Sequence, residues 1–329
     1  MYNNNTTKAP WKKCILFMVA TMLFTTAYSK NSRFRFINNK TETSFRFTMV
    51  QNLIVIPVKV NDMDLNLILD TGMRSIVLFG KHFERKLETL DDVTVKLSGY
   101  GKKKNRPGKL SLGNEINIAD VLGTEMGIVI MPSPDLFRQV GLKDIDGIIG
   151  YEIFSRFKVK IDYPGTEITL YEPFVNLALP QFDAIPLTIK DTKPYIPAKM
   201  VNSAGEETQG YFHVDTGSAQ DILLFHHKDK PHNFKFARNT NVGVGIGGKI
   251  RGYRADPTTL SIGKHYNKEV EPKYILRGFS NRELQDAQGS IGSDFLSDSV
   301  IIFDYIHQKM YISKKGDVGV YYIVNRPVY

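Results

Sequence analysis

The tripeptide Asp-Thr-Gly occurs twice in the chain, and each copy places a carboxylate among apolar residues. Asp70 lies in the stretch LNLILDTGMRSIVLF, and Asp215 lies in the stretch YFHVDTGSAQDILLF. A carboxylate beside a hydrophobic core costs free energy unless the protein uses it. Two neighbouring carboxylates share one proton over a wide pH range, so such a pair can deprotonate a water while it protonates a carbonyl oxygen. If the fold brings Asp70 and Asp215 together, the sequence predicts general acid–base chemistry.

Both copies of the motif belong to a long internal repeat. Each copy is followed by the same landmarks, which are LSLG or LSIG, then GIIGYEIF or GSIGSDFL, then an Asp-Tyr pair. The spacings agree, because Gly150 follows Asp70 by 80 residues and Gly292 follows Asp215 by 77. A single Asp-Thr-Gly fits an ordinary Asx turn at a strand end, but two copies in matching frames are hard to explain in that way. The pattern indicates a duplicated unit of about 145 residues.

Short runs rich in Val, Ile and aromatic residues indicate β-strands throughout the repeat. Examples are NLIVIPVKV, DVTVKLSGY and SVIIFDY. Only GYEIFSRF and GSDFLSDS are expected to form helices, and these are short. The segment 171–186 holds three prolines and no repeat landmark, so we expect it to link the two halves. The sequence predicts a mainly β protein with an N-terminal lobe at residues 30–178 and a C-terminal lobe at residues 179–329.

The first 29 residues have the features of a secretory signal peptide. Three lysines precede an apolar stretch at residues 14–24, and Ala-Tyr-Ser at 27–29 is a small-x-small cleavage site. The apolar stretch is short for a membrane span, although an uncleaved anchor is the alternative. We therefore expect the mature protein to begin at Lys30, without stable membrane insertion. Its expected location is the periplasm or the extracellular space.

Removal of this segment changes the composition of the chain. The single Cys14 and the single Trp11 leave with it, so the mature protein is expected to have no disulfide and no thiol chemistry. The full chain carries 43 basic and 34 acidic residues, a net charge of +9, and the loss of three lysines leaves +6. This mild positive charge does not require a nucleic-acid partner, and we expect none.

The paired motifs resemble those of the aspartic proteases. They are most similar to the bacterial retropepsin-like aspartyl protease family, here with two lobes in one chain as in pepsin. The resemblance implies a bilobal pepsin-like architecture built from two duplicated retropepsin-like β-barrel lobes, with an extended peptide or protein substrate bound between them. It implies that Asp70 and Asp215 form a catalytic dyad that activates a water for hydrolysis of a peptide bond. It also implies a monomer that needs no metal and no cofactor.

The resemblance further implies supporting roles for the residues around the two carboxylates. The two Thr side chains would brace the loops against each other, and the hydroxyl of Ser218 would donate to Asp215. Hairpins ending at LSLG and LSIG would cover the substrate as flaps, although the Tyr candidates equally fit ordinary strand positions. The residues carried over as dyad supports are Thr71, Gly72, Thr216, Gly217 and Ser218, and the flap candidates are Tyr100, Gly101, Gly247 and Tyr253.

Met73 departs from the family pattern, which has Ser, Thr or Ala after Asp-Thr-Gly. Asp70 then lacks the hydroxyl donor that Asp215 has in Ser218. The shared proton is therefore expected mainly on Asp70, with Asp215 as the ionised partner. The same departure motivates an alternative function, a protein of the same fold that binds peptides without cleaving them.

Three other motifs could indicate a different function, and each gives weaker support than the paired Asp-Thr-Gly motifs. GVGIGGK at residues 243–249 has the spacing of a nucleotide-binding loop, but IRGYRADP follows where a helix is needed. We expect a second flap hairpin there, with a nucleotide-dependent enzyme as a weaker alternative. KKKNR at 102–106 is expected to be a solvated hairpin tip, although at the rim of a cleft it would favour acidic peptides. His226, His227 and His232 lack the spacing of a zinc protease.

Overall fold

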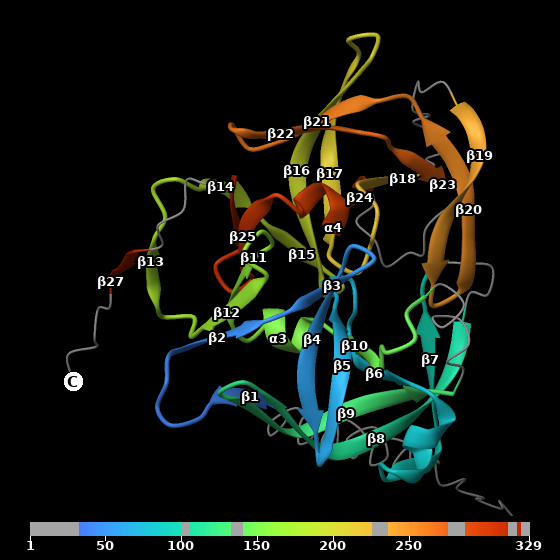
Figure 1. The fold of residues 1–329 in the computed structure, drawn as a ribbon, viewed down its shortest axis with the longest axis vertical. Helices are drawn as coiled ribbons and strands as arrows, with labels where there is room; N and C mark the ends of the chain where they lie inside the picture. The colour runs from blue at the N-terminus through green and yellow to red at the C-terminus, as the bar shows by residue number, and fades with distance from the viewer. Residues whose placement is uncertain are drawn as a thin grey trace, which may run out of the picture.

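The computed structural model describes residues 33–100, 105–132, 141–225, 236–275, 287–314 and 321–323 (Figure 1). The described chain is mainly β, which confirms the predicted fold class at that level. The predicted signal peptide, Gly101, the three histidines of the 226–232 segment and residues 102–104 lie outside the described residues. No helix among the described residues has the length and apolar character needed to cross a membrane.

The first large sheet is built from residues 33–149, in the first half of the chain. Its strand β8 pairs with both β4 and β9, so a ring closes through β4, β5, β10, β6, β9 and β8. A short 3-10 helix, η1 (Lys81–Arg85), follows β6. The strands of this sheet are β1 (Arg33–Phe36), β3 (Thr48–Val50), β4 (Leu53–Val60), β5 (Met63–Leu69), β6 (Ile76–Phe79), β7 (Thr89–Ser98), β8 (Asn105–Ile118), β9 (Val121–Met131) and β10 (Gly147–Ile149).

The second large sheet is built from residues 188–292, in the second half of the chain. Its strands are β15 (Thr188–Lys190), β16 (Lys193–Asn202), β17 (Glu207–Asp215), β18 (Ile222–Phe225), β19 (Phe236–Gly245), β20 (Gly248–Ala255), β21 (Thr258–Ile262), β22 (Tyr266–Val270), β23 (Lys273–Ile275) and β24 (Ala287–Gly292).

The two large sheets repeat one strand arrangement. In the first, β5 runs parallel to β10, and β10 runs antiparallel to β6. In the second, β17 runs parallel to β24, and β24 runs antiparallel to β18. Parallel neighbours need a long connection, and here each connection is the stretch between Asp-Thr-Gly and the next Ile-Gly landmark. The repeat in the sequence therefore corresponds to a repeat in strand pairing.

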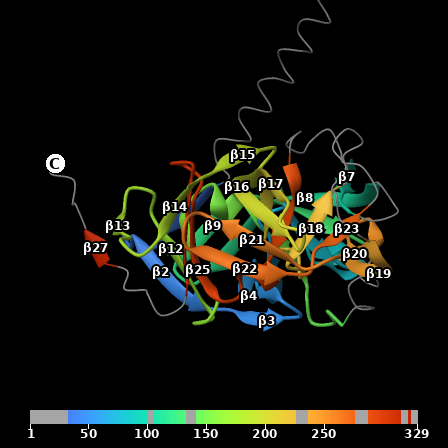
Figure 2. The same cartoon turned by 90° about the horizontal axis from the view of Figure 1, so that it is seen from above.

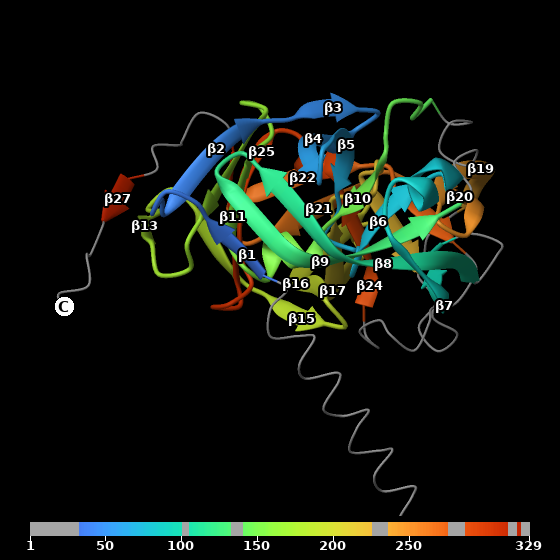
Figure 3. The ribbon, with the colours of Figure 1, turned by 90° about the horizontal axis from the view of Figure 1, so that it is seen from below.

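A third sheet contains strands from both halves. Strand β11 pairs antiparallel with β25, so strands from matching positions of the repeat lie side by side, with their Asp-Tyr pairs at opposite ends (Figure 3). The predicted linking segment is itself partly in strands, because β14 pairs with β26 and β13 pairs with β27. The strands outside the two large sheets are β2 (Glu42–Arg46), β11 (Lys158–Asp162), β12 (Glu167–Tyr171), β13 (Asn176–Ala178), β14 (Asp183–Pro186), β25 (Ser299–Asp304), β26 (Lys309–Lys314) and β27 (Tyr321–Ile323).

The main hydrophobic core runs through both halves without interruption. The predicted short helices are present as α3 (Tyr151–Phe154) and α4 (Ser293–Leu296), and each contributes a buried Phe to this core. The ring of Phe154 packs edge-on against Phe303 of the other half, with centroids 5.3 Å apart. Shared apolar burial of this kind, about 25 cal/mol per Å² of surface removed from water, holds the halves together in a protein without disulfides.

Candidate active site

Each Asp-Thr-Gly loop begins where a strand of the parallel pair ends. Strand β5 ends at Leu69, and the backbone N–H of Asp70 donates to the carbonyl of Ile149 at 2.9 Å. The glycines of the two Ile-Gly landmarks, Gly150 and Gly292, lie so close to another stretch of backbone that no side chain fits there. A Cβ added to Gly150 would lie 1.9 Å from the carbonyl oxygen of Asp70, and one added to Gly292 would lie 2.1 Å from that of Gln220. The Ile-Gly landmark therefore marks the point where another backbone presses against the Asp loop.

The structure brings the carboxyl groups of Asp70 and Asp215 together, because a Cβ added to Gly72 would lie 3.1 Å from Asp70 Oδ1 and 3.2 Å from Asp215 Oδ1. Each carboxyl also accepts the N–H of its own motif glycine, at 2.7 Å for Gly72 to Asp70 Oδ1 and 3.2 Å for Gly217 to Asp215 Oδ1. A Cβ at Gly217 would lie 2.2 Å from Asp70 Cγ, so only glycine leaves room for the opposite carboxyl.

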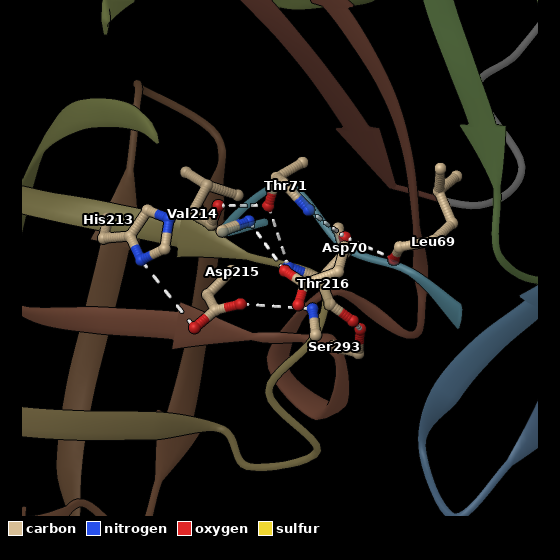
Figure 4. Close-up of polar contacts among 10 residues, drawn as sticks. Leu69, Asp70, Thr71, His213, Val214, Asp215, Thr216 and Ser293 are labelled. Atoms are coloured by element: carbon tan, nitrogen blue, oxygen red, sulfur yellow. Dashed lines mark hydrogen bonds and ion pairs between the residues drawn. The ribbon is translucent and has the colours of Figure 1, made fainter. Parts of the chain in front are cut away.

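The two Thr side chains of the motifs lock the loops together, in the arrangement that the resemblance implies (Figure 4). Thr71 Oγ1 donates to the carbonyl of Val214 at 2.6 Å and accepts the N–H of Thr216 at 3.0 Å. Thr216 Oγ1 donates to the carbonyl of Leu69 at 2.8 Å and accepts the N–H of Thr71 at 3.0 Å. Both side chains are fully buried. This reciprocal brace fixes one carboxyl relative to the other.

Burial and mutual repulsion control the protonation of the pair. Burial raises the pKa of Asp215 well above its ordinary value of 3.8, and the negative charge of Asp70 raises it further. The pKa of Asp70 is also raised by burial, but the N–H groups of Gly72 and Met73 oppose that effect. Asp70 is the less buried of the two and accepts the shorter glycine N–H bond. These contacts favour the shared proton on Asp215.

The sequence-based expectation, drawn from Met73 and Ser218, placed the proton on Asp70 instead. The expectation required the Ser218 hydroxyl to donate to Asp215, and within the described part of the chain that hydroxyl makes no such bond. The backbone of Ser218 is engaged instead, since its N–H donates to the carbonyl of Asp215 and its carbonyl accepts the N–H of Ser293. The side chain of Met73 is buried in an apolar cluster.

A histidine that the sequence reading overlooked lies beside the pair. His213 Nδ1 is 3.7 Å from Asp215 Oδ2, the oxygen that does not accept the Gly217 N–H (Figure 4). The ring is buried and lies near Tyr195, with centroids 5.4 Å apart. Burial lowers the pKa of His213 well below 6.5, and the positive charge of Lys193 lowers it further, so the imidazole is neutral. Strand alternation could have indicated this position, because residues i and i+2 share one face.

Two hairpins, β7–β8 and β19–β20, lie on the same side of the molecule (Figure 2). Their tips meet, because the N–H of Gly247 donates to the carbonyl of Tyr100 at 2.9 Å. Each tip packs on the opposite half. Ile246 joins an apolar cluster with Met73, and the Tyr100 ring lies 6.2 Å from Phe225.

The other flap predictions need correction. Tyr253 is five residues beyond the tip glycine Gly248 and pairs with Tyr274 in the sheet, so it is a strand tyrosine. LSLG lies inside β8, where the β7–β8 pairing ends at Ser111, as expected for the first hairpin. The β19–β20 hairpin instead ends at Ala255, before the LSIG stretch at residues 260–263. GVGIGGK forms the β19–β20 tip and is followed by strand β20, not by the helix that a nucleotide-binding loop needs.

No group of three or more His, Cys, Asp or Glu suited to a metal ion is found among the residues that the structure describes. No protein-family model matches this chain, and no curated protein matches it. A proposal for its function therefore rests on the geometry of the site.

Glu152 of α3, two residues after the landmark Gly150, supplies a third carboxyl near the site. Its Oε2 is buried and has no hydrogen-bond partner within the described ranges, and burial raises the pKa of Glu152 from 4.5 to about 7. The pKa of Glu152 is higher in the folded protein than in the unfolded protein. The stabilisation that Glu152 contributes is therefore complete below about pH 4.5 and is lost as pH rises towards 7.

The change Glu152→Gln is therefore expected to stabilise the protein above pH 7, by up to roughly 3 kcal/mol, and to leave it nearly unchanged at pH 4. Urea unfolding at several pH values measures this difference. A variant with the same pH dependence as the natural protein would show that Glu152 does not titrate in this range.

Proposed function

We propose that the chain is an exported aspartic endopeptidase, with the mature protein beginning at Lys30. The observation that carries the proposal is the close pair of Asp70 and Asp215 carboxyls, held on two loops that Thr71 and Thr216 brace reciprocally. A carboxyl pair in this setting is costly for folding, and aspartic protease chemistry gives it a use. The repeated strand arrangement and the joined hairpin tips support the finer proposal of a bilobal, pepsin-like fold related to the bacterial retropepsin-like family.

The proposed reaction uses water as the nucleophile. Ionised Asp70 accepts a proton from the water as its oxygen attacks the carbonyl carbon of the scissile peptide bond, while Asp215 gives its proton to the carbonyl oxygen. The tetrahedral gem-diol then collapses as the nitrogen takes a proton from Asp70 and Asp215 recovers one from a hydroxyl. The C–N bond breaks, the products are a carboxylic acid and an amine, and the pair returns to its starting protonation state.

The surroundings of the pair suit this reaction. A raised pKa keeps one proton on the pair at pH values where exposed aspartates have lost theirs. The hairpin tips, joined through Gly247 and Tyr100, would have to separate to admit an extended peptide and would then exclude bulk water around it. The substrate in this proposal is a peptide or protein, and the protein acts as a monomer without metal, cofactor or nucleic acid.

The competing proposal is a protein of the same fold that binds peptides without cleaving them. Met73 favours it, because no hydroxyl follows the first Asp-Thr-Gly. Both proposals predict peptide binding beneath the hairpins, and only the first predicts new peptide termini.

Incubation of residues 30–329 with a diverse peptide mixture, from about pH 3 to about pH 7, separates the two proposals. Mass spectrometry should detect new termini with the natural protein and none with a folded Asp70→Asn protein. Intact peptides at every pH, together with peptide capture by the folded protein, would replace the protease proposal with the binding proposal.

A further inference from the structure

The sheet surfaces on either side of the carboxyl pair differ between the two halves. In the first half, Ile68 pairs with Ile148 across β5 and β10. In the second half, His213 pairs with Ser290 across β17 and β24. These are matching positions of the repeat. Ile68 and His213 each lie two residues before the Asp of the motif, and Ile148 and Ser290 each lie two residues before the landmark glycine. An apolar pair in one half thus corresponds to a polar pair in the other.

Both pairs lie on the sheet face that the hairpin tips cover. Ile68 and Ile148 belong to the cluster that includes the tip residue Ile246. His213 pairs with Tyr195, and Ser290 pairs with Leu223. Directly paired residues in antiparallel strands have side chains on the same face.

The face that carries His213 and Ser290 meets the other hairpin tip. Tyr195 and Leu223 belong to an apolar cluster against which Tyr100 packs. Each half therefore presents one of these pairs beneath the tip of the opposite hairpin.

The polar pair has unused hydrogen-bonding capacity. His213 Nε2 and Ser290 Oγ are both buried, and neither has a hydrogen-bond partner among the residues that the structure describes. Buried polar atoms in native proteins nearly always have partners, so an unpaired atom requires an explanation. Two such atoms lie on directly paired residues, and one of them belongs to the ring that faces Asp215. They point to a ligand group that supplies the missing hydrogen bonds.

The charges around this pair favour a neutral group. The groups near His213 are the ring of Tyr195, the carboxyl of Asp215 and the positive charge of Lys193. A substrate carboxylate here would be repelled by the ionised carboxyl pair, and a substrate cation would be repelled by Lys193. A buried charge without its own counter-charge is costly, whereas an amide can both donate and accept hydrogen bonds.

We propose that the substrate side chain held against β17 and β24 is an uncharged amide, as in Asn or Gln, recognised by His213 and Ser290. The side chain held against β5 and β10 is apolar, because Ile68 and Ile148 take the matching positions. The two positions lie on opposite sides of the carboxyl pair, so the two preferences fall on opposite sides of the scissile bond. This inference rests on the proposed function and names its substrate class.

The first test maps the bonds that the natural protein cleaves in a diverse peptide mixture. The expected pattern has an apolar residue on one side of the bond and Asn or Gln on the other. Synthetic peptides that differ only by Gln or Leu at the second position then give a ratio of kcat/KM values. We expect the ratio to favour Gln by about tenfold or more. A ratio near one overturns the inference while leaving the protease proposal intact.

Variants assign the preference to the two residues. Ser290→Ala and His213→Leu should each lower the Gln-to-Leu ratio about tenfold, and His213→Asn should restore part of it. The matched control is Ile148→Ala, which truncates the partner position of the other half and should leave this ratio unchanged. A general effect of a variant on the carboxyl pair changes kcat/KM equally for both peptides, so it does not change their ratio. An equal ratio in the natural protein and Ser290→Ala would contradict the role of Ser290.

A binding measurement separates this inference from the proposed chemistry. The Gln and Leu peptides are titrated against the folded Asp215→Asn protein, in which no cleavage is needed for a result. Tighter binding of the Gln peptide supports the inference even if the natural protein cleaves nothing. Equal affinity for the two peptides overturns it.

Discussion

Replacing Asp215 by asparagine is expected to lower kcat for peptide cleavage by about 10⁴-fold, with a much smaller change in KM. The amide cannot give up and recover a proton as the carboxyl does, so the step in which the carbonyl oxygen is protonated loses its acid. The change preserves the shape of the side chain and its contact with the N–H of Gly217. The measurement is steady-state kinetics on a peptide that the natural protein cleaves.

Asp221→Asn is the matched control, because this half-buried aspartate lies six residues further along the same half and takes no part in the pair. Its kcat should stay within a few-fold of the natural value. Unfolding curves show whether either variant is damaged. The natural protein should lose stability as pH rises through the raised pKa of Asp215, whereas Asp215→Asn should lack that loss. More than a tenth of the natural kcat in a folded Asp215→Asn protein would contradict the assigned chemistry.

Replacing Thr71 by valine is expected to destabilise the protein by roughly 2–5 kcal/mol. Valine keeps the shape but removes the hydroxyl that donates to the Val214 carbonyl and accepts the Thr216 N–H. Both of these backbone groups would then be buried and unpaired. The two carboxyls would also lose part of the brace that fixes their separation, so kcat should fall as well.

Thr258→Val is a suitable comparison for this change. Thr258 is equally buried, but its hydroxyl makes a single local bond to the carbonyl of Asp256 at 3.1 Å. Its substitution should cost about 1 kcal/mol and leave kcat unchanged. Urea unfolding measures both proteins. Equal destabilisation by the two substitutions would mean that the brace contributes no more than an ordinary buried hydroxyl.

The features that the sequence predicted are those fixed by local pattern and repetition. Two copies of Asp-Thr-Gly with equal spacing to an Ile-Gly landmark suffice to expect paired loops, because the close approach at Gly150 and Gly292 allows no larger residue. The short helices α3 and α4 follow from the residues just after those glycines. Alternating apolar runs predict strands in the same way.

The features that the sequence did not reveal depend on contacts between distant segments. His213 stands in an apolar run and resembles a core residue until β17 places it beside Asp215. The difference between the two carboxyls, such as the 2.7 Å and 3.2 Å glycine N–H bonds, arises from the folded loops and has no signature in the sequence. Tyr253 was a reasonable flap candidate until the length of the β19–β20 hairpin placed the tip at Gly248.

The shared proton is the property on which the proposed chemistry depends, and carboxyl ¹³C NMR of protein labelled at the aspartate side chain observes it directly. The Asp70→Asn and Asp215→Asn proteins assign the two resonances. At about pH 5.5, where exposed aspartates are ionised, the Asp215 carboxyl should still be protonated and the Asp70 carboxyl ionised. Two resonances that both titrate independently near the ordinary value of 3.8 would show that the carboxyls share no proton, and would contradict the proposed acid–base pair.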